Sequence, residues 1–334
     1  MILTFCQVAC DLGLFKKLTE APGPLSSVSL AAASGADSVL LGRIFRFLVS
    51  NDIIAEVGED AFIANGITRT LARPGFRAGI AHSFSAVMPC LQETPKFLAN
   101  TRYVNPTDVL HSPFQLAHKT DKPSYVWAME QPELMADFNL WMAEQHQGQN
   151  TWLDVFDFVS HVDGSSADTL IFVDVGGGIG QQCALLKRTH PQVLGRVILQ
   201  DQPFVLPQAI PTEGVETQPF DFWTEQPVKG ARVYYMRNIL EDYPDEKAIT
   251  IIRNIIPAMS SDSVLVIDEM IIPNSGANLR STVQDMIMMT SLASAERTER
   301  QWDALLDKAG LALLQKTAYN PETGESIIVA VPKH

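Results

Sequence analysis

From about residue 151 onward, the chain alternates short apolar runs with segments of helical or turn character. The predicted strands are residues 169–175, 196–199, 232–236, 263–267 and 326–331. All but the last are followed by a helical or turn segment. Strands that alternate with helices in this way form a mostly parallel sheet with helices on both faces. The pattern therefore predicts a doubly wound, Rossmann-like α/β domain over residues 151–334.

The first 150 residues have helical periodicity instead. Residues 1–75 are predicted to form three short helices followed by a small hairpin, an order typical of a winged helix. The helices are indicated by apolar Val8, Leu12, Leu14 and Phe15, by a serine-capped start at 27–31 and by the amphipathic run 39–48, and the hairpin strands are 53–57 and 61–64. Residues 76–150 are predicted to be mostly helical.

Composition narrows the class of protein. The chain has 334 residues, of which 46% are hydrophobic and 19% charged, which is typical of an ordered globular protein with room for two cores. The net charge is -13, and the third predicted helix offers only Arg43 and Arg46 to a phosphate backbone. We therefore expect no nucleic-acid partner.

The chain also lacks the signals of a membrane or secreted protein. No apolar run approaches the roughly 20 residues that a membrane span needs, so we expect no membrane partner. The apolar N-terminus is expected to be an amphipathic helix, not a signal peptide. The four cysteines show neither metal-ligand nor redox spacing. These features favour a reduced, cytoplasmic protein.

A glycine-rich loop follows the first strand of the α/β domain. Its residues 174–180 have the pattern D-x-G-x-G-x-G, formed by Asp174, Gly176, Gly178 and Gly180. Glycines let the backbone approach a ligand closely, and the following helix N-terminus favours an anionic group. A dinucleotide fingerprint fails because its last glycine position is Gln181. S-adenosylmethionine (SAM) fits the sequence better than a dinucleotide does. Asp174 lies at the loop, and Asp201, at the end of the next strand, can accept hydrogen bonds from the ribose hydroxyls. A tight turn without a ligand is the alternative.

Together with this loop, residues 237–245 (RNILEDYPD) carry the resemblance to a known family. The chain resembles, over nearly its whole length, the fungal and plant SAM-dependent O-methyltransferases that act on phenolic and polyketide-type metabolites. The resemblance implies that SAM or S-adenosylhomocysteine is bound by the loop and Asp201, with Asp221 and Phe222 beside the adenine. It also implies that Arg237 lies near the ribose and sulfonium. The N-terminal winged helix is implied to form a homodimer and the back of a small-molecule substrate pocket.

Glu241 stands where this family has its catalytic histidine. The family's equivalents of Glu269 and Glu296, in the motifs 268–273 and 295–302, bracket and orient that histidine. The catalytic group implied for this chain is therefore Glu241, Glu269, Glu296 and Arg237. Proton transfer from a phenol to an ordinary glutamate is less favourable than to histidine by about 3 kcal/mol, but burial and neighbouring acids raise a carboxyl pKa and reduce this difference.

Three functions remain open at this point. The chain is a true O-methyltransferase, using Glu241 as base or acting on an acidic hydroxyl of an aromatic, polyketide or pyridone-type substrate. Alternatively, it is a methyltransferase-fold pericyclase or dehydratase of the Diels-Alder or Alder-ene type, in which Arg237 and Glu241 activate a carbonyl. The third alternative is a non-catalytic SAM-binding partner protein.

The resemblance also implies a pocket wall within and beyond residues 76–150. The expected lining is His118, Phe138, Met142, His146 and Met288. Phe138, Met142 and His146 follow a four-residue step and share one helical face, although ordinary core packing explains such apolar positions equally well. Either histidine is a candidate to replace the missing base. No metal is expected, because the magnesium-dependent members of the wider class lack this N-terminal domain.

Overall fold

The computed structural model describes residues 1–144 and 148–333. It divides into two compact units. The first unit comprises Met1–Asn100 and Pro113–Gly148, and the second comprises Thr101–Ser112 and Gln149–His334. Within the described residues no single helix is long and apolar enough to cross a membrane. One pair of helices, Ser27–Ser34 and Ser38–Val49, bent by 117°, meets that test only through its combined length and composition.

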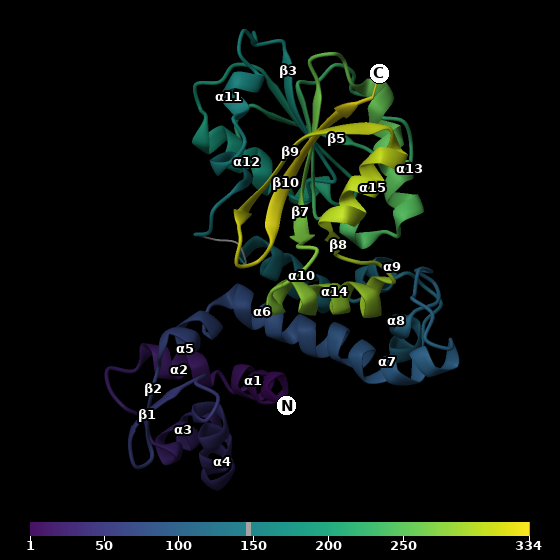
Figure 1. Cartoon of the computed structure of the whole chain (residues 1–334). Coiled ribbons are helices and arrows are strands. Elements are labelled where there is room, and N and C mark those ends of the chain that lie inside the picture. The colour runs from purple at the N-terminus through teal and green to yellow at the C-terminus, as the bar shows by residue number, and fades with distance from the viewer. Residues whose placement is uncertain (145–147, 334) are drawn as a thin grey trace. The chain divides into compact units, whose positions relative to one another are not determined.

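The second unit is built on one twisted sheet (Figure 1), with the strand order β5-β4-β3-β6-β7-β10-β9. The strands are β3 Leu170–Val175, β4 Arg196–Asp201, β5 Val215–Pro219, β6 Val233–Arg237, β7 Val264–Ile272, β8 Arg297–Thr298, β9 Leu311–Asn320 and β10 Glu325–Pro332. The path from β5 to β7 is parallel, β10 is antiparallel to both neighbours, and β8 pairs with β7. From β3 the chain adds β4 and β5 on one side of the sheet and then β6 and β7 on the other, so the order of strands reverses at β3. In sheets of this kind, ligands bind outside the carboxyl ends of the strands at that point.

Helices cover both faces of this sheet (Figure 1). The helices of the second unit are η2 Trp152–Asp154, α11 Phe158–His161, α12 Gln181–Thr189, η3 Leu206–Gln208, η4 Leu240–Asp242, α13 Asp245–Ile255, η5 Ile256–Ala258, α14 Leu279–Leu292 and α15 Glu299–Ala309. One core contains Ile252 of α13 and Trp302 of α15, and the other contains Trp152 and Leu186 of α12. The predicted doubly wound class I methyltransferase-type fold is confirmed.

Three strands were not predicted from the sequence. The edge strand β5 reads VETQP, and its side chains are only half-buried or exposed, so it lacks an apolar run. The opposite edge strand β9 exposes Leu313 and Leu314 and so has no clean alternation of apolar and polar positions. The two-residue β8 is too short to give a pattern. Edge strands are specified by pairing with a neighbour more than by local sequence.

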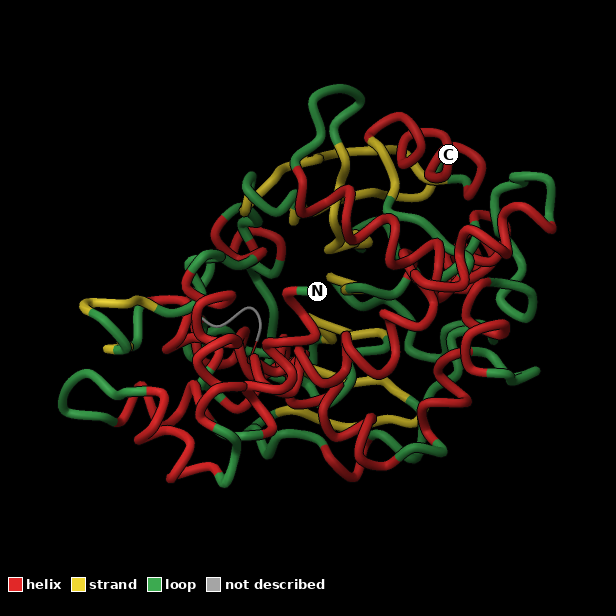
Figure 2. Tube along the Cα trace, turned by 90° about the horizontal axis from the view of Figure 1, so that it is seen from below, coloured by secondary structure: helices red, strands yellow, loops and turns green. Residues whose placement is uncertain are grey.

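The N-terminal part of the first unit contains four helices before the hairpin, so the prediction of three was wrong. They are α1 Ile2–Asp11, α2 Leu14–Glu20, α3 Ser27–Ser34 and α4 Ser38–Val49, followed by β1 Ala55–Gly58, β2 Ala61–Ile63 and α5 Gly66–Leu71. Gly13, with φ +65°, separates α1 from α2. The left-handed conformation ends a helix, although the apolar positions continue through it. Figure 2 shows that helices, in red, make up most of the chain outside the large sheet.

The rest of the first unit is helical, as predicted. It contains α6 Pro74–His82, the π-helix η1 Ser83–Val87, α7 Met88–Asn100, α8 Pro113–His118, α9 Ser124–Met129 and α10 Pro132–Glu144. The helices α6 and α10 pack very closely. A Cβ added to Gly79 would lie 2.7 Å from the Trp141 ring, and Glu144 accepts a hydrogen bond from Arg73 Nε at 2.6 Å. The absence of a side chain at Gly79 therefore allows α10 to lie this close to α6.

We expect Gly79→Ala to lower the free energy of unfolding by about 1–3 kcal/mol, because overpacking outweighs alanine's better helix propensity. Urea unfolding monitored by circular dichroism measures this. The matched control is Gly66→Ala in α5, where nothing lies within 4 Å of the added Cβ. Equal midpoints for the two variants would contradict the close α6–α10 contact.

Candidate active site

The glycine loop runs from the carboxyl end of β3 to the start of α12. Gly176 has φ +70°, and a Cβ there would lie 2.7 Å from Ile239 Cδ1 and 3.7 Å from Phe222. A Cβ on the neighbouring Gly177 would collide with the Asp174 carboxyl. The loop is therefore packed on one side against the segment that carries Glu241. Sequence analysis missed the steric need at Gly177, which depends on the fold around Asp174.

Asp201 holds this loop from the end of β4. Its Oδ2 accepts the Gly178 N–H at 2.8 Å, and its Oδ1 accepts the Gln202 N–H at 2.7 Å. Each carboxylate oxygen keeps a second lone pair, so ribose hydroxyls still have acceptors. Asp174 is buried at the end of β3, and burial raises its pKa to about 7. The half-buried glycine loop and these acids fit the adenosine part of SAM.

The loop after β5 brings an aromatic group to the same edge of the sheet. Asp221 is exposed and accepts the Trp223 N–H at 3.1 Å. The Phe222 and Trp223 rings contact the Tyr243 ring edge-on, with centroids 5.9 and 5.1 Å away. Asn254 Nδ2 donates to the Phe222 carbonyl at 3.0 Å and so anchors the loop. Trp223 and Tyr243 thus lie together with the predicted Asp221–Phe222 pair. The motif alone did not indicate either of these two aromatic residues.

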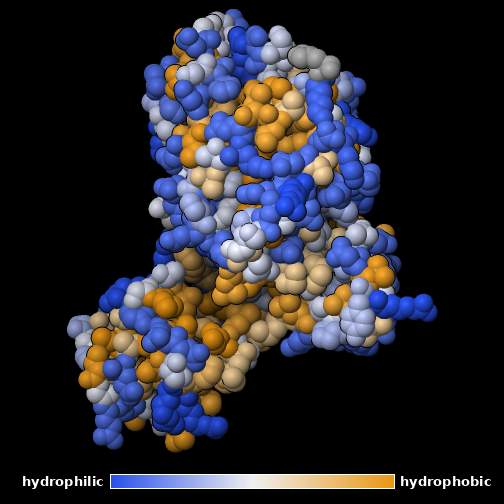
Figure 3. Space-filling view, in the orientation of Figure 1, coloured by the Kyte–Doolittle hydropathy of each residue, from blue (hydrophilic) through white to orange (hydrophobic). Residues whose placement is uncertain are grey.

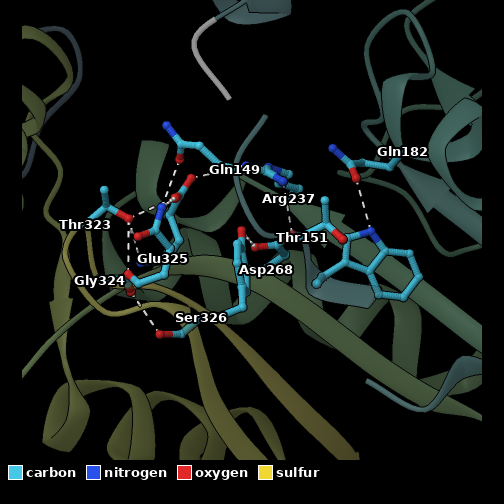
Figure 4. A network of polar contacts seen from close by, with 12 residues as sticks. Gln149, Thr151, Gln182, Arg237, Asp268, Thr323, Gly324, Glu325 and Ser326 are labelled. Carbon is cyan, nitrogen blue, oxygen red and sulfur yellow. Dashed lines mark hydrogen bonds and ion pairs between the residues drawn. The ribbon is translucent and has the colours of Figure 1, made fainter. Parts of the chain in front are cut away.

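Arg237 ends β6 and is only 14% exposed (Figure 4), so its charge needs partners within the protein. Nη1 lies 3.4 Å from Asp268 Oδ2 and Nη2 lies 3.3 Å from Glu325 Oε1. Asp268 also accepts hydrogen bonds from the buried hydroxyls of Tyr235 and Tyr319. Although burial opposes the guanidinium charge, Asp268 and the neighbouring acids raise the pKa of Arg237. Arg237 therefore stays cationic.

Glu241 sits in the short helix η4, whose backbone is held by three side chains. Glu269 Oε1 accepts the N–H groups of Ile239 at 3.1 Å and Leu240 at 2.7 Å. Ser294 Oγ donates to the Glu241 carbonyl. Arg297 donates from Nη1 to the Leu240 carbonyl and from Nη2 to the Tyr243 carbonyl, both at 2.7 Å. We call this arrangement the η4 clamp.

Arg297 is the member of the clamp that sequence analysis missed. It is 3% exposed, its Nε lies 2.8 Å from Asp245 Oδ1, and its guanidinium lies over the Trp302 ring at 5.3 Å. The residue lies in the quoted 295–302 motif, but only the fold brings it to η4. A buried guanidinium whose three nitrogens each hold a protein partner acts as a structural cation.

Three buried carboxyl groups gather beside η4. Glu269 Oε2 and both carboxyl oxygens of Glu296 are buried without a partner of good hydrogen-bond geometry. Burial is the largest cause that raises the pKa of Glu241, and the Asp242 charge adds to it. Burial and the Glu241 charge raise the pKa values of Glu269 and Glu296 too. The proximity of Glu296 lowers the pKa of Glu241 and offsets part of this rise.

The predicted pocket residues fall in different places. One ring nitrogen of His118, Nε2, is hydrogen-bonded to the Ala86 carbonyl at 2.9 Å, and the ring contacts that of Trp127 at a tilt of 41°. Phe138 contacts the His82 ring at 5.2 Å. Met288 is buried on α14, and His146 lies outside the described residues. Since His118, Phe138 and Met142 belong to the first unit and Met288 to the second, their joint pocket stays a prediction.

His82 is a histidine for which the sequence gave no argument. It ends α6 just before the π-helix η1, and its buried Nδ1 has no hydrogen-bond partner. Burial lowers its pKa, which keeps the ring neutral. A single π-helical turn often marks a functional site. Among the described residues no group of three or more His, Cys, Asp or Glu side chains could hold a metal ion.

Two family models cover most of the chain. One, described as an O-methyltransferase domain, matches residues 112–312, and one described as an O-methyltransferase dimerisation domain matches residues 2–72. The chain belongs to the O-methyltransferase family. The order of a dimerisation domain followed by a methyltransferase domain agrees with the resemblance on which the site was predicted.

Similar proteins are fungal. O-methyltransferase lepI of Aspergillus flavus is 39% identical over 94% of this chain and 83% of its own length. The 16-O-methyltransferase bsc6 of Alternaria brassicicola is also 39% identical, over 98% of this chain and 82% of its own. Solved structures of LepI with SAM and of a pericyclic reaction enzyme each align with TM-score 0.93 and 36% identity, over 99% of this chain and 86% of theirs. The proteins to which this chain is similar are thus described by two chemistries, O-methyl transfer and a pericyclic reaction.

We expect Arg297→Gln to lower the free energy of unfolding of the second unit by about 3 kcal/mol, because a buried cation and two carbonyl partners are lost together. Denaturant unfolding followed by the fluorescence of the buried Trp152 and Trp302 measures this. The control is Arg253→Gln, since exposed Arg253 donates one hydrogen bond to the Lys308 carbonyl, which should cost less than about 1 kcal/mol. Similar losses in both variants would contradict the η4 clamp.

Proposed function

We propose that the protein transfers a methyl group from SAM to an acidic hydroxyl of a flat, apolar metabolite, with Glu241 as the proton acceptor. One observation carries this proposal. Glu241 is buried on a rigidly held turn, and its burial, together with the Asp242 charge, raises its pKa. A base whose pKa is nearer to that of the hydroxyl removes a larger part of the proton-transfer cost.

SAM supplies an electrophilic methyl group on a cationic sulfur when it is bound. The loop glycines present backbone to it, Asp201 accepts hydrogen bonds from its ribose, and Asp221 and Phe222 lie beside its adenine. Arg237 contributes a fixed positive charge at the end of β6. Support comes from the loop geometry and from the similar LepI structure, which was solved with SAM.

Glu296 and Glu269 act on the proton that Glu241 receives. Burial and the surrounding carboxyl charges raise the pKa of Glu296 more than that of Glu241, so Glu296 keeps its proton while Glu241 can be ionised before reaction. Glu269 holds the two N–H groups that precede Glu241 and so fixes the backbone that carries it. The enzyme would mostly position reactants and remove one proton, which is the larger part of what this transfer needs.

A pericyclic or dehydrating reaction is the second candidate, favoured by the aligned structure of a pericyclic reaction enzyme. In that case Glu241 would work in its protonated form. The same raised pKa would let it donate a hydrogen bond to a substrate carbonyl at neutral pH. Arg237 would add positive charge to the activated carbonyl. The two candidates therefore require opposite protonation states of one carboxyl group.

We also propose that the protein acts as a homodimer through residues 2–72. This segment matches the dimerisation model and exposes large apolar side chains, and Figure 3 shows hydrophobic surface on the N-terminal helices. The exposed residues are Ile2, Val28, Val39, Leu40, Val57 and Ile67. Apolar side chains grouped on a surface commonly mark a protein interface. His118, Phe138 and Met142 of the first unit are proposed to contact the substrate.

We expect Asp201→Ala to raise the dissociation constant of SAM by at least about tenfold, because charge-assisted hydrogen bonds to the ribose and to the Gly178 N–H are lost. Isothermal calorimetry measures this. The control is Glu216→Ala, which breaks an exposed ion pair with Arg196 on the neighbouring strand. Wild-type protein that gives no heat with SAM would contradict cofactor binding at the loop.

We expect methylation to rise with pH through the raised pKa of Glu241, because the base works only after it loses its proton. Mass spectrometry of the product from hydroxylated polyketides or pyridones, with and without SAM, measures this. Glu241→Gln should lower kcat by about 100-fold or more, Glu241→His should restore it, and exposed Glu246→Gln should leave it unchanged. A rate that falls with rising pH, with product of unchanged mass or short of one water, would select the pericyclic or dehydrating function.

A further inference from the structure

Arg237 has two acidic partners that come from different strands. Asp268 lies on β7, next to β6, while Glu325 begins β10. One acid meets Nη1 and the other meets Nη2. An ion pair at a single nitrogen leaves a guanidinium free to turn, whereas contacts at both ends of the planar fork set its orientation. The Glu325 contact is absent from the motifs by which Arg237 was recognised.

Two hydrogen-bonded arms extend from these acids to adjacent residues of β9. In the inner arm, Tyr319 Oη donates to Asp268 Oδ1 at 2.7 Å, and the Tyr319 carbonyl accepts from Asn150 Nδ2 at 3.0 Å. Tyr319 and Asp268 are both buried. The inner arm therefore joins Arg237 to Asn150 through Asp268 and Tyr319.

The outer arm starts at Glu325 (Figure 4). Asn320 Nδ2 donates to Glu325 Oε2 at 3.0 Å and to Gln149 Oε1 at 2.9 Å. These two contacts use both hydrogens of the Asn320 amide. Thr323 Oγ1 adds a third contact, to Glu325 Oε2 at 2.8 Å. Both arms thus end at neighbouring residues, Gln149 and Asn150, where the chain enters the second unit.

We propose that Glu325 is a positioning residue for Arg237, and that the arms through Tyr319 and Asn320 make the orientation of this guanidinium depend on the segment Gln149–Asn150. The inference rests on the proposed function only in assigning Arg237 to the cofactor side of the site. Glu325 supplies a charge to Nη2, while Asn320 keeps the Glu325 carboxylate in place. A change at Gln149 or Asn150 therefore alters the orientation of Arg237 through these hydrogen bonds, without any contact to SAM.

The first experiment measures the state of Arg237 itself. The full-length protein and its Glu325→Gln variant are treated with phenylglyoxal, and the rate of labelling at Arg237 is followed by peptide mass spectrometry. Glutamine removes the charge and turns an amide donor toward the Asn320 amide, so we expect labelling about fivefold faster, the change that the loss of one hydrogen bond gives. Ser326→Ala is the control, since Ser326 Oγ bonds only locally to the Gly324 carbonyl at 2.9 Å.

Asn320→Ala tests the outer arm and should also speed labelling of Arg237, with Arg196 labelled equally in every variant. When Glu325→Gln and Asn320→Ala are combined, the change in labelling rate, expressed as a free energy, should be smaller than the sum of the two single changes, because both residues act through the same hydrogen-bonded arm. Wild-type labelling rates in Glu325→Gln would overturn the positioning role. Wild-type rates in Asn320→Ala alone would overturn the connection to Gln149.

SAM calorimetry on the same proteins separates this inference from the proposed function. We expect Glu325→Gln to weaken SAM binding by about fivefold, with the midpoint of thermal unfolding close to that of Ser326→Ala. Faster Arg237 labelling in a protein that never binds SAM would support the positioning role and overturn the cofactor assignment. Unchanged labelling in a Glu325→Gln protein that binds SAM normally would overturn the positioning role and support the cofactor assignment.

Discussion

An acidic and a basic side chain together hold the backbone of residues 239–243, and the chemistry of the site depends on that constraint. Short helices such as η4 leave N–H and C=O groups without partners inside the helix. Here the Glu269 carboxylate takes two N–H groups, and the Arg297 guanidinium takes two carbonyls. A buried turn of this kind would otherwise be expensive, since each orphaned group costs about 1–3 kcal/mol. The clamp makes Glu241 a rigid part of the site.

The same constraint explains the electrostatics. The two buried arginines are both engaged elsewhere, Arg297 by carbonyls and Asp245, and Arg237 by Asp268 and Glu325. Neither is placed to neutralise Glu241, Glu269 and Glu296 by direct pairing. Three carboxyl groups that are buried together cannot all be ionised, because desolvation and mutual repulsion favour keeping protons. Burial is thus the main cause of the raised pKa values, and the arginines, which are engaged elsewhere, only partly offset it at Glu241 and Glu269.

The sequence predicted the parts of this site that local pattern encodes. The strand–glycine loop–helix unit, Asp174 and Asp201 follow from residues close in the chain, and the resemblance supplied Glu241, Glu269 and Glu296. Arg297 and Glu325 were beyond such reasoning, because their roles arise from contacts across 57 and 88 residues. Gly13 was missed for a related reason: its φ decides a helix boundary that hydrophobic periodicity crosses without interruption. Edge strands β5 and β9 depended on their neighbours rather than on their own composition.

A glutamate in the place of a histidine changes more than the strength of a base. A neutral histidine accepts a proton and becomes a cation between two glutamates, which then attract it. Glu241 accepts a proton and becomes neutral, which removes its repulsion with Asp242 and Glu269. The acidic surroundings that stabilise a histidinium therefore stabilise a protonated glutamate as well, and the clamp needs no rebuilding. The neutral form is also a hydrogen-bond donor. One scaffold can thus serve methyl transfer or carbonyl activation, and the position of a single proton at Glu241 decides between them.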